Sequence, residues 1–153
     1  MQSVDISIVL PEKTEVYYPK GADSTEISSR ASYKIYAPID VSCSTCLLKF
    51  KYWDDYYAEI REYNNTELIP VCSSKDNFES LKYWFENDKI YKISVPVLLD
   101  TENKFRVLNS GLFEETKDIA ILTDADNRIL YVGSPLENQQ DKKIFLEYLK
   151  SSK

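Results

Sequence analysis

The chain has no histidine, and its 153 residues include only three cysteines and three glycines. Without histidine, a zinc or iron–sulfur site would need carboxylates to complete the ligand set around these thiols, and a copper carrier that pairs two cysteines with a histidine is excluded. No run of about 18 apolar residues occurs, so no transmembrane helix is expected. The low glycine content, with 43% hydrophobic and 29% charged residues, is typical of a folded globular chain.

Runs of basic residues are also missing. Nineteen Lys and Arg against 25 Asp and Glu give a net charge of −6. No basic surface that could neutralise phosphates is expected, so nucleic acid is not an expected partner. The N-terminal stretch MQSVDISIVLPEK lacks the basic and apolar regions of a signal peptide, which is therefore absent or already removed.

A single domain is expected at this length, large enough to fold without disulfides. Residues 3–10 alternate apolar and polar side chains, which predicts a half-buried strand, and residues 13–31 are Ser-rich and predict a loop. Residues 33–40, rich in Tyr and Ile, predict a second strand. We expect an N-terminal strand and loop extension over residues 1–32, packed on a main domain over residues 33–153.

Helical spacing begins directly after the second strand. Apolar side chains step by four, three, four and three residues along Cys46, Phe50, Trp53, Tyr57 and Ile60. This spacing places them on one face of a helix, and that face should contact the core.

Short apolar runs and helical patterns alternate in the next part of the chain. Residues 67–72 predict a buried strand, although Pro70 lacks a backbone N–H, which an edge position or a bulge would accommodate. Residues 75–89 predict a helix capped by Asp76, and residues 95–100 predict a third apolar strand.

Two apolar runs joined by an acidic turn predict a hairpin over residues 118–135, and residues 139–150 predict a terminal helix. The order of these elements predicts an α/β fold with a central mixed β-sheet flanked by helices on both faces.

The motif VSCSTC places two cysteines where the second predicted strand meets the helix. Backbone N–H groups and the helix dipole at this position favour a thiolate, which lowers the pKa of the first cysteine, Cys43. Cys46 lies on the buried face of the helix, close enough to Cys43 for a disulfide. This arrangement predicts a redox pair in which Cys43 attacks and Cys46 resolves, although a structural disulfide or two core thiols remain alternatives.

Other chemistry fits the residues less well. A peroxide-reducing site needs a cysteine where Thr45 stands, three residues after Ser42. Cys72 ends a predicted strand and reads as a buried apolar thiol rather than a third redox partner. The twelve tyrosines could form a stacking platform for carbohydrate, but those at positions 52, 56, 57 and 63 lie on a predicted helix where packing or solvation explains them.

Residues 33–150 resemble the thioredoxin superfamily, and more closely its TlpA-like branch of bacterial envelope thiol–disulfide oxidoreductases. The resemblance rests on an ordered series of segments: a strand into SCSTC and its helix, ELIPVC, VPVLLDTENKF and AILTDADNRILYVGSP. It implies a thioredoxin-like fold in which Cys43 is the nucleophile and Cys46 the resolving thiol, with no cofactor. Protein thiols or disulfides and a thiol redox partner are the implied partners. The implied location is extracytoplasmic, in the periplasm or facing it, with a lipid anchor possible upstream of this sequence.

The sequence departs from this family at the substrate-binding positions. Ser44 and Thr45 stand between the cysteines, where Pro or His is usual, and the absence of His favours a reductase. The family's cis-proline is replaced, and Pro96 is followed by too long a chain to take its role. We expect a trans peptide before Ile119, because a cis bond without proline costs several kcal/mol. Ser44, Thr45, Asp118 and Ile119 are the expected substrate contacts. The alternative is a non-catalytic thioredoxin-like binding module whose two cysteines form a structural disulfide.

Overall fold

The computed structural model describes residues 6–17, 32–42, 47–61, 63, 66–87, 95–110 and 119–150. Its helices and strands, in chain order, are β1 (Thr14–Tyr17), β2 (Tyr33–Asp40), α2 (Lys49–Ile60), β3 (Thr66–Ser73), α3 (Glu79–Glu86), β4 (Val97–Asp100), α4 (Phe105–Leu108), β5 (Ala120–Asp124), β6 (Ile129–Gly133) and α5 (Gln139–Lys150).

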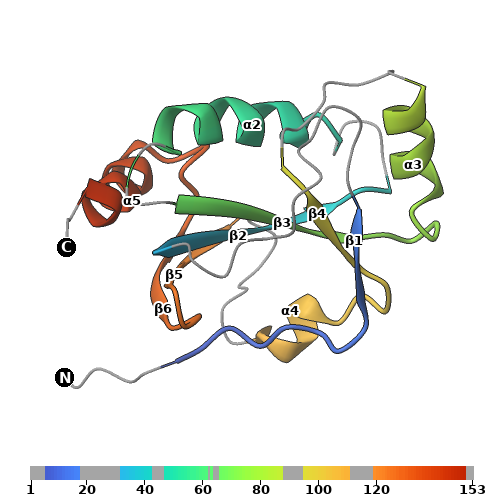
Figure 1. Cartoon of the computed structure of the whole chain (residues 1–153), viewed down its shortest axis with the longest axis horizontal. Coiled ribbons are helices and arrows are strands. Elements are labelled where there is room, and N and C mark those ends of the chain that lie inside the picture. Colours follow the sequence, from blue (N-terminus) through green and yellow to red (C-terminus); the bar gives the residue numbers. More distant parts are fainter. Residues whose placement is uncertain are drawn as a thin grey trace.

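The described strands form one six-stranded sheet in the order β1-β4-β3-β2-β5-β6 (Figure 1). The three central strands β2, β3 and β4 are parallel, while β1 pairs antiparallel with β4, and β5 and β6 add an antiparallel hairpin beside β2. The predicted mixed sheet is therefore confirmed. Parallel central strands must bury both faces, which requires helices on each side.

Helices cover both faces of the sheet, as the sequence predicts (Figure 1). Alternate residues of β2 belong to two cores, one on each face of the sheet. Ile35 packs in the core that holds Phe50 of α2 and Phe145 of α5, whereas Tyr36 packs with Phe105 of α4 on the opposite face. This alternation follows from the two-residue period of a strand. Among the described residues, none of the helices combines the length and the apolar composition of a transmembrane span.

The N-terminal segment crosses the α4 face of the sheet to reach β1 (Figure 1). It begins beside β6, where the backbone N–H of Ile129 donates to Ile6 at 2.7 Å. Ile8 is buried in the core below the sheet, and the Asn109 side chain bonds both backbone groups of Val9, at 2.9 Å and 2.8 Å. Packing and specific hydrogen bonds therefore hold this segment against the sheet.

Two predictions for the N-terminal region are wrong. Within residues 6–10 the sheet contact is a single bridge at Ser7, not the predicted strand. Residues 14–17, predicted as loop, form β1 because they pair with β4, with Val16 opposite Leu98. Pairing with a distant strand overrides the weak local propensity of this stretch. Residues 18–31 lie outside the described part of the chain.

The expectation of an edge position or a bulge at Pro70 is also wrong. β3 is an interior strand, and its register with β2 runs without a shift, Pro70 lying opposite Ala37. The register with β4 covers only Val71 and Cys72. Pro70 lies just before the pairing of β3 with β4 begins, so its missing backbone N–H is tolerated.

The predicted helices are confirmed with small shifts. Phe50, Trp53 and Ile60 of α2 are buried as predicted, but the fourth buried residue of this helix is Tyr56, and Tyr57 is half-buried. Asp76 precedes α3 and accepts a hydrogen bond from the backbone N–H of Ser80 at 3.1 Å, as expected for a capping residue. The terminal helix α5 has the predicted bounds.

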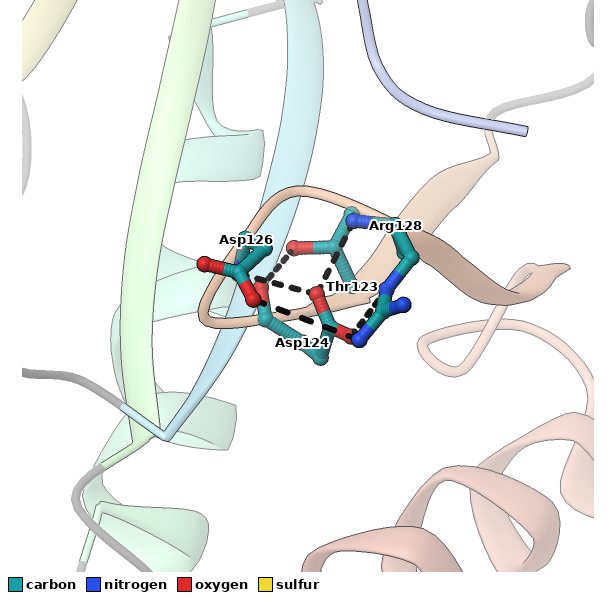
Figure 2. A network of polar contacts seen from close by, with 4 residues as sticks. All are labelled: Thr123, Asp124, Asp126 and Arg128. Carbon is teal, nitrogen blue, oxygen red and sulfur yellow. Dashed lines mark hydrogen bonds and ion pairs between the residues drawn. The ribbon is translucent and has the colours of Figure 1, made fainter. Parts of the chain in front are cut away.

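The predicted hairpin turn is confirmed between β5 and β6, and Figure 2 shows its polar network. The Asp124 carboxylate accepts hydrogen bonds from the backbone N–H groups of Asp126 and Arg128, both at 2.9 Å, and from Arg128 Nε at 3.0 Å. Asn127 has a positive φ of 68°, which asparagine tolerates well in turns. The acidic residues of this motif therefore stabilise the turn.

Candidate functional site

Five of the predicted site residues lie outside the described part of the chain: Cys43, Ser44, Thr45, Cys46 and Asp118. Their roles stay predictions. The structure does describe the chain on both sides of the cysteine motif, and it describes the predicted substrate contact Ile119, which is half-buried immediately before β5.

The chain that enters the cysteine motif is anchored to the end of the neighbouring strand. The backbone N–H of Val41 donates to the carbonyl of Ser73 at 2.8 Å, and that of Lys75 donates to Ser42 Oγ at 2.6 Å. The Asp40 carboxylate also accepts the backbone N–H of Ser42 at 2.9 Å. Residues 40–42 therefore have a defined position at the carboxyl end of β2, beside β3.

The chain that leaves the motif is anchored by burial. Leu47 and Phe50 are both fully buried in the core between α2 and the sheet. The first turn of α2, which follows Leu48, contains no acidic residue. No carboxylate in this turn therefore offsets the positive end of the helix dipole, which favours a negative charge nearby.

The third cysteine, Cys72, is a buried and unreactive thiol. Cys72 is completely buried, opposite Ile39 of β2 and Leu99 of β4. Burial raises the pKa of this thiol, so it stays protonated. The predicted burial of Cys72 is confirmed, and nothing in its surroundings favours redox chemistry.

A groove of about 510 Å³ lies between α2, the β6–α5 connection and the start of α5. Its walls include Leu48 and Tyr52 of α2, the predicted contact Ile119, and Leu136 from the connection. Leu48 is two residues after Cys46, and Ile119 follows Asp118 directly. The groove therefore begins beside both undescribed segments that carry predicted site residues.

One residue of the groove lining, Tyr56, carries a polar group that is itself buried. Tyr56 is 4% exposed, and its hydroxyl has no hydrogen-bond partner among the described residues. Its ring packs edge-on against Trp53, with centroids 5.7 Å apart, and Lys142 Nζ lies 5.9 Å from its centroid. Burial, together with the nearby charge of Glu59, raises the pKa of Tyr56, so the hydroxyl stays protonated as a potential donor.

A second cavity, of about 210 Å³, lies at the carboxyl ends of the parallel strands. Its main polar groups are already paired. The Asp100 carboxylate accepts the backbone N–H groups of Lys104 and Phe105, at 3.0 Å and 2.7 Å, and Asn103 exchanges two hydrogen bonds with the backbone of Ser74. These contacts are structural, because they cap α4 and join it to the end of β3.

Sequence reasoning did not identify the groove. Its lining comes from segments around residues 38, 48–59, 119 and 134–142, which only the folded sheet brings together. The available local signal was the spacing of Leu48, Tyr52 and Tyr56, four residues apart, which marks one row of side chains along α2. No three Cys, Asp or Glu side chains of the described residues are arranged to hold a metal ion.

No family model matches the sequence, and no curated protein matches it. Solved structures do match over nearly the whole chain. A thiol-disulfide isomerase from Corynebacterium glutamicum is 18% identical, with a TM-score of 0.61 over 97% of this chain and 98% of that one. A thiol:disulfide interchange protein of the thioredoxin family from Chlorobium tepidum is 11% identical, with a TM-score of 0.60 over 97% and 100% of the two chains.

A thioredoxin-like protein from Porphyromonas gingivalis, described as uncharacterized, is 18% identical, with a TM-score of 0.60 over 92% of this chain and 90% of that one. These TM-scores over most of each chain show a shared fold, at low sequence identity. The chain has a thioredoxin-like fold.

Proposed function

We propose that the protein is a thiol–disulfide oxidoreductase that cycles Cys43 and Cys46 between dithiol and disulfide. The Cys43 thiolate attacks one sulfur of a partner disulfide, forming a mixed disulfide and releasing the other partner sulfur as a thiolate. The Cys46 thiolate then attacks Cys43, which closes the Cys43–Cys46 disulfide and releases the second partner thiolate. The partner gains two electrons, and a separate dithiol restores the protein.

The position of the CxxC motif carries this proposal. It joins an anchored strand end at Ser42 to a helix that is fixed in the core from Leu47 onward. The start of α2 offers a helix dipole without an acidic residue in its first turn, which supports a reactive thiolate at Cys43. Similar folds named as thiol–disulfide isomerase and interchange proteins support the same chemistry.

Reduction is the proposed direction, because Ser44 and Thr45 between the cysteines offer no histidine to stabilise the thiolate as in a strong oxidant. Protein disulfides and a thiol redox partner are the proposed reactants. An extracytoplasmic location is proposed with this activity, because disulfides persist in oxidising compartments.

The proposal is tested by insulin reduction with dithiothreitol as the electron source. We expect turnover by the unaltered protein, loss of turnover in Cys43→Ser and in Cys46→Ser, and retention in Cys72→Ala, because that thiol is completely buried. The Cys72 variant also controls for the mere presence of a thiol. Absence of turnover together with a Cys43–Cys46 bond that resists dithiothreitol would support the structural-disulfide alternative instead.

A further inference from the structure

We propose that Ser42 is a positioning residue for the redox pair: its side chain binds the β3–α3 turn, residues 74–78, and this contact holds Cys43 where the start of α2 stabilises its thiolate. The inference rests on the proposed function and concerns what tunes it. Three observations carry it: the hydrogen bonds of Ser42, the strained backbone of the β3–α3 turn, and a second anchor of that turn at Asn103.

Ser42 is held through both its backbone and its side chain. Its backbone N–H donates to Asp40 Oδ1 at 2.9 Å, and its Oγ accepts the backbone N–H of Lys75 at 2.6 Å. Val41, the residue before it, is completely buried and donates its own backbone N–H to the carbonyl of Ser73 at 2.8 Å. The bond to Lys75 joins residues 33 positions apart in the chain, so it fixes the end of β2 against the β3–α3 turn.

The β3–α3 turn that supplies this N–H group has a strained backbone. Asn77 and Phe78 have positive φ values of 58° and 65° in succession. Asparagine tolerates this region, but a bulky residue such as phenylalanine rarely adopts it. Ser74 supports the turn, because its Oγ accepts the backbone N–H groups of Asp76 and Phe78, both at 3.0 Å. A strained conformation persists only where its surroundings hold it, and such conformations cluster at functional sites.

A second anchor holds the start of the β3–α3 turn from the connection between β4 and α4. Asn103 accepts the backbone N–H of Ser74 at 2.9 Å and donates to the carbonyl of Ser74 at 2.8 Å. Because Ser74 directly precedes Lys75, these two bonds fix the residue next to the N–H group that Ser42 accepts. The Asn103 side chain therefore joins α4 to β3 and also restrains the hydrogen-bond partner of Ser42.

The position of Ser42 matters because Cys43 follows it directly in the chain. A helix dipole favours a nearby negative charge by a factor of roughly two to five, and this effect is confined to the first turn. The first turn of α2 contains no acidic residue that would oppose it. Without the bond between Ser42 and Lys75, the chain that enters the motif loses an anchor, and the thiolate of Cys43 should on average be stabilised less.

The test compares Ser42→Ala, which removes the acceptor, with Ser42→Thr, which keeps a hydroxyl oxygen. Alkylation of the reduced protein by iodoacetamide across a pH series, with peptide mass mapping, gives the pKa of Cys43. In Ser42→Ala we expect the thiolate fraction of Cys43 below that pKa to fall about threefold. The equilibrium with glutathione should shift toward the Cys43–Cys46 disulfide, because the reduced protein loses stabilisation. Ser42→Thr should keep both values.

A matched control separates positioning from loss of stability. Tyr57→Phe removes the hydrogen bond from the Tyr57 hydroxyl to the carbonyl of Thr66, which lies on α2 away from the β3–α3 turn. We expect this variant to be destabilised but to keep the pKa of Cys43 and the equilibrium with glutathione. None of these variants alters a charged side chain, so a shift in the pKa of Cys43 reports its position and not a changed charge nearby.

Asn103→Gly tests whether the β3–α3 turn acts through Ser42. Asn103 has a positive φ of 55°, which glycine adopts readily, so the change removes the amide side chain without straining the backbone. We expect the thiolate fraction of Cys43 to fall in this variant too. The double variant with Ser42→Ala should fall no further than Ser42→Ala alone, because both changes act through one hydrogen bond.

An unchanged pKa of Cys43 in Ser42→Ala, or an equal shift in Ser42→Thr or Tyr57→Phe, would overturn the inference. Additive shifts in the double variant would do the same. A reduced protein that exchanges with no disulfide, yet shows the shift in Ser42→Ala, would overturn the proposed function and leave the positioning role supported. Normal exchange without that shift would overturn the positioning role and leave the proposed function supported.

Discussion

Replacing Tyr56 by Phe should stabilise the protein, because the change removes a buried hydroxyl group and leaves the ring in place. The variant keeps the ring, and with it the edge-on contact to Trp53 at 5.7 Å and the contact of Lys142 Nζ with the ring at 5.9 Å. It deletes only the hydroxyl, which is buried and has no hydrogen-bond partner among the described residues. The loss of that group therefore removes a desolvation cost without removing a bond.

The magnitude follows from the cost of an unsatisfied polar group. Leaving a buried donor unpaired costs about 1–3 kcal/mol. We expect Tyr56→Phe to raise the free energy of unfolding by the lower end of this range, about 1 kcal/mol. The neighbouring residue gives a matched control: the Tyr57 hydroxyl donates to the carbonyl of Thr66 at 3.1 Å. Tyr57→Phe should lose about 1 kcal/mol, the usual net value of such a bond.

Urea titration at equilibrium measures both variants against the unaltered protein, and thermal melting should show shifts of roughly 3 °C in opposite directions. A loss of stability in Tyr56→Phe as large as that in Tyr57→Phe would show that the Tyr56 hydroxyl is bonded within the folded chain. That result would refute the reasoning from the unsatisfied group.

Three further predictions concern the framework around the site. Asp76→Ala should lower the free energy of unfolding by about 1 kcal/mol through the loss of a helix cap, measured by urea titration. Hydrogen bonds from two serine side chains lower the pKa of Asp76. The stability that the Asp76 carboxylate contributes should therefore be present above the ordinary carboxyl pKa and be lost as the pH falls through the pKa of the folded state. Gly133→Ala should cost about 1–3 kcal/mol by overpacking, because its Cβ would lie 2.7 Å from Asp141 Cγ, and a melting temperature equal to that of the unaltered protein would contradict this. Asn109→Ala should lower the free energy of unfolding by about 2 kcal/mol, since Asn109 makes three buried or half-buried hydrogen bonds, and should speed hydrogen exchange at the amide of Val9; unchanged exchange would show that other contacts hold the segment.

Elements with strong local signals were predictable from the sequence. The hairpin around Asp124 and the terminal helix α5 depend on residues within one turn or one helix face, and both match the structure. β1 was not predictable, because residues 14–17 become a strand only through pairing with β4, more than 80 residues later along the chain (Thr14 with Asp100). Likewise, α2 buries Tyr56 in place of the predicted Tyr57, and the Tyr56 ring also meets Lys142 of α5, a contact that the spacing within α2 does not record.

The candidate site divides in the same way. The cysteine motif was recognisable from the sequence, because strand, motif and helix are adjacent in the chain. The groove was not, because its walls come from α2, from the residue before β5 and from the β6–α5 connection, and no local pattern records that they meet. The proposed chemistry depends on the motif, which is the local part of the site.

The most direct measurement for the proposed redox pair is the trapping of a mixed disulfide in the Cys46→Ser variant. Without the resolving thiol, the bond that the attacking cysteine forms with a disulfide substrate should accumulate, and peptide mass mapping identifies the residue that carries it. We predict that the substrate adduct is found on Cys43 in Cys46→Ser, and that no adduct accumulates on Cys72, which is completely buried. No adduct on Cys43, or an adduct on Cys72 in its place, would contradict the account.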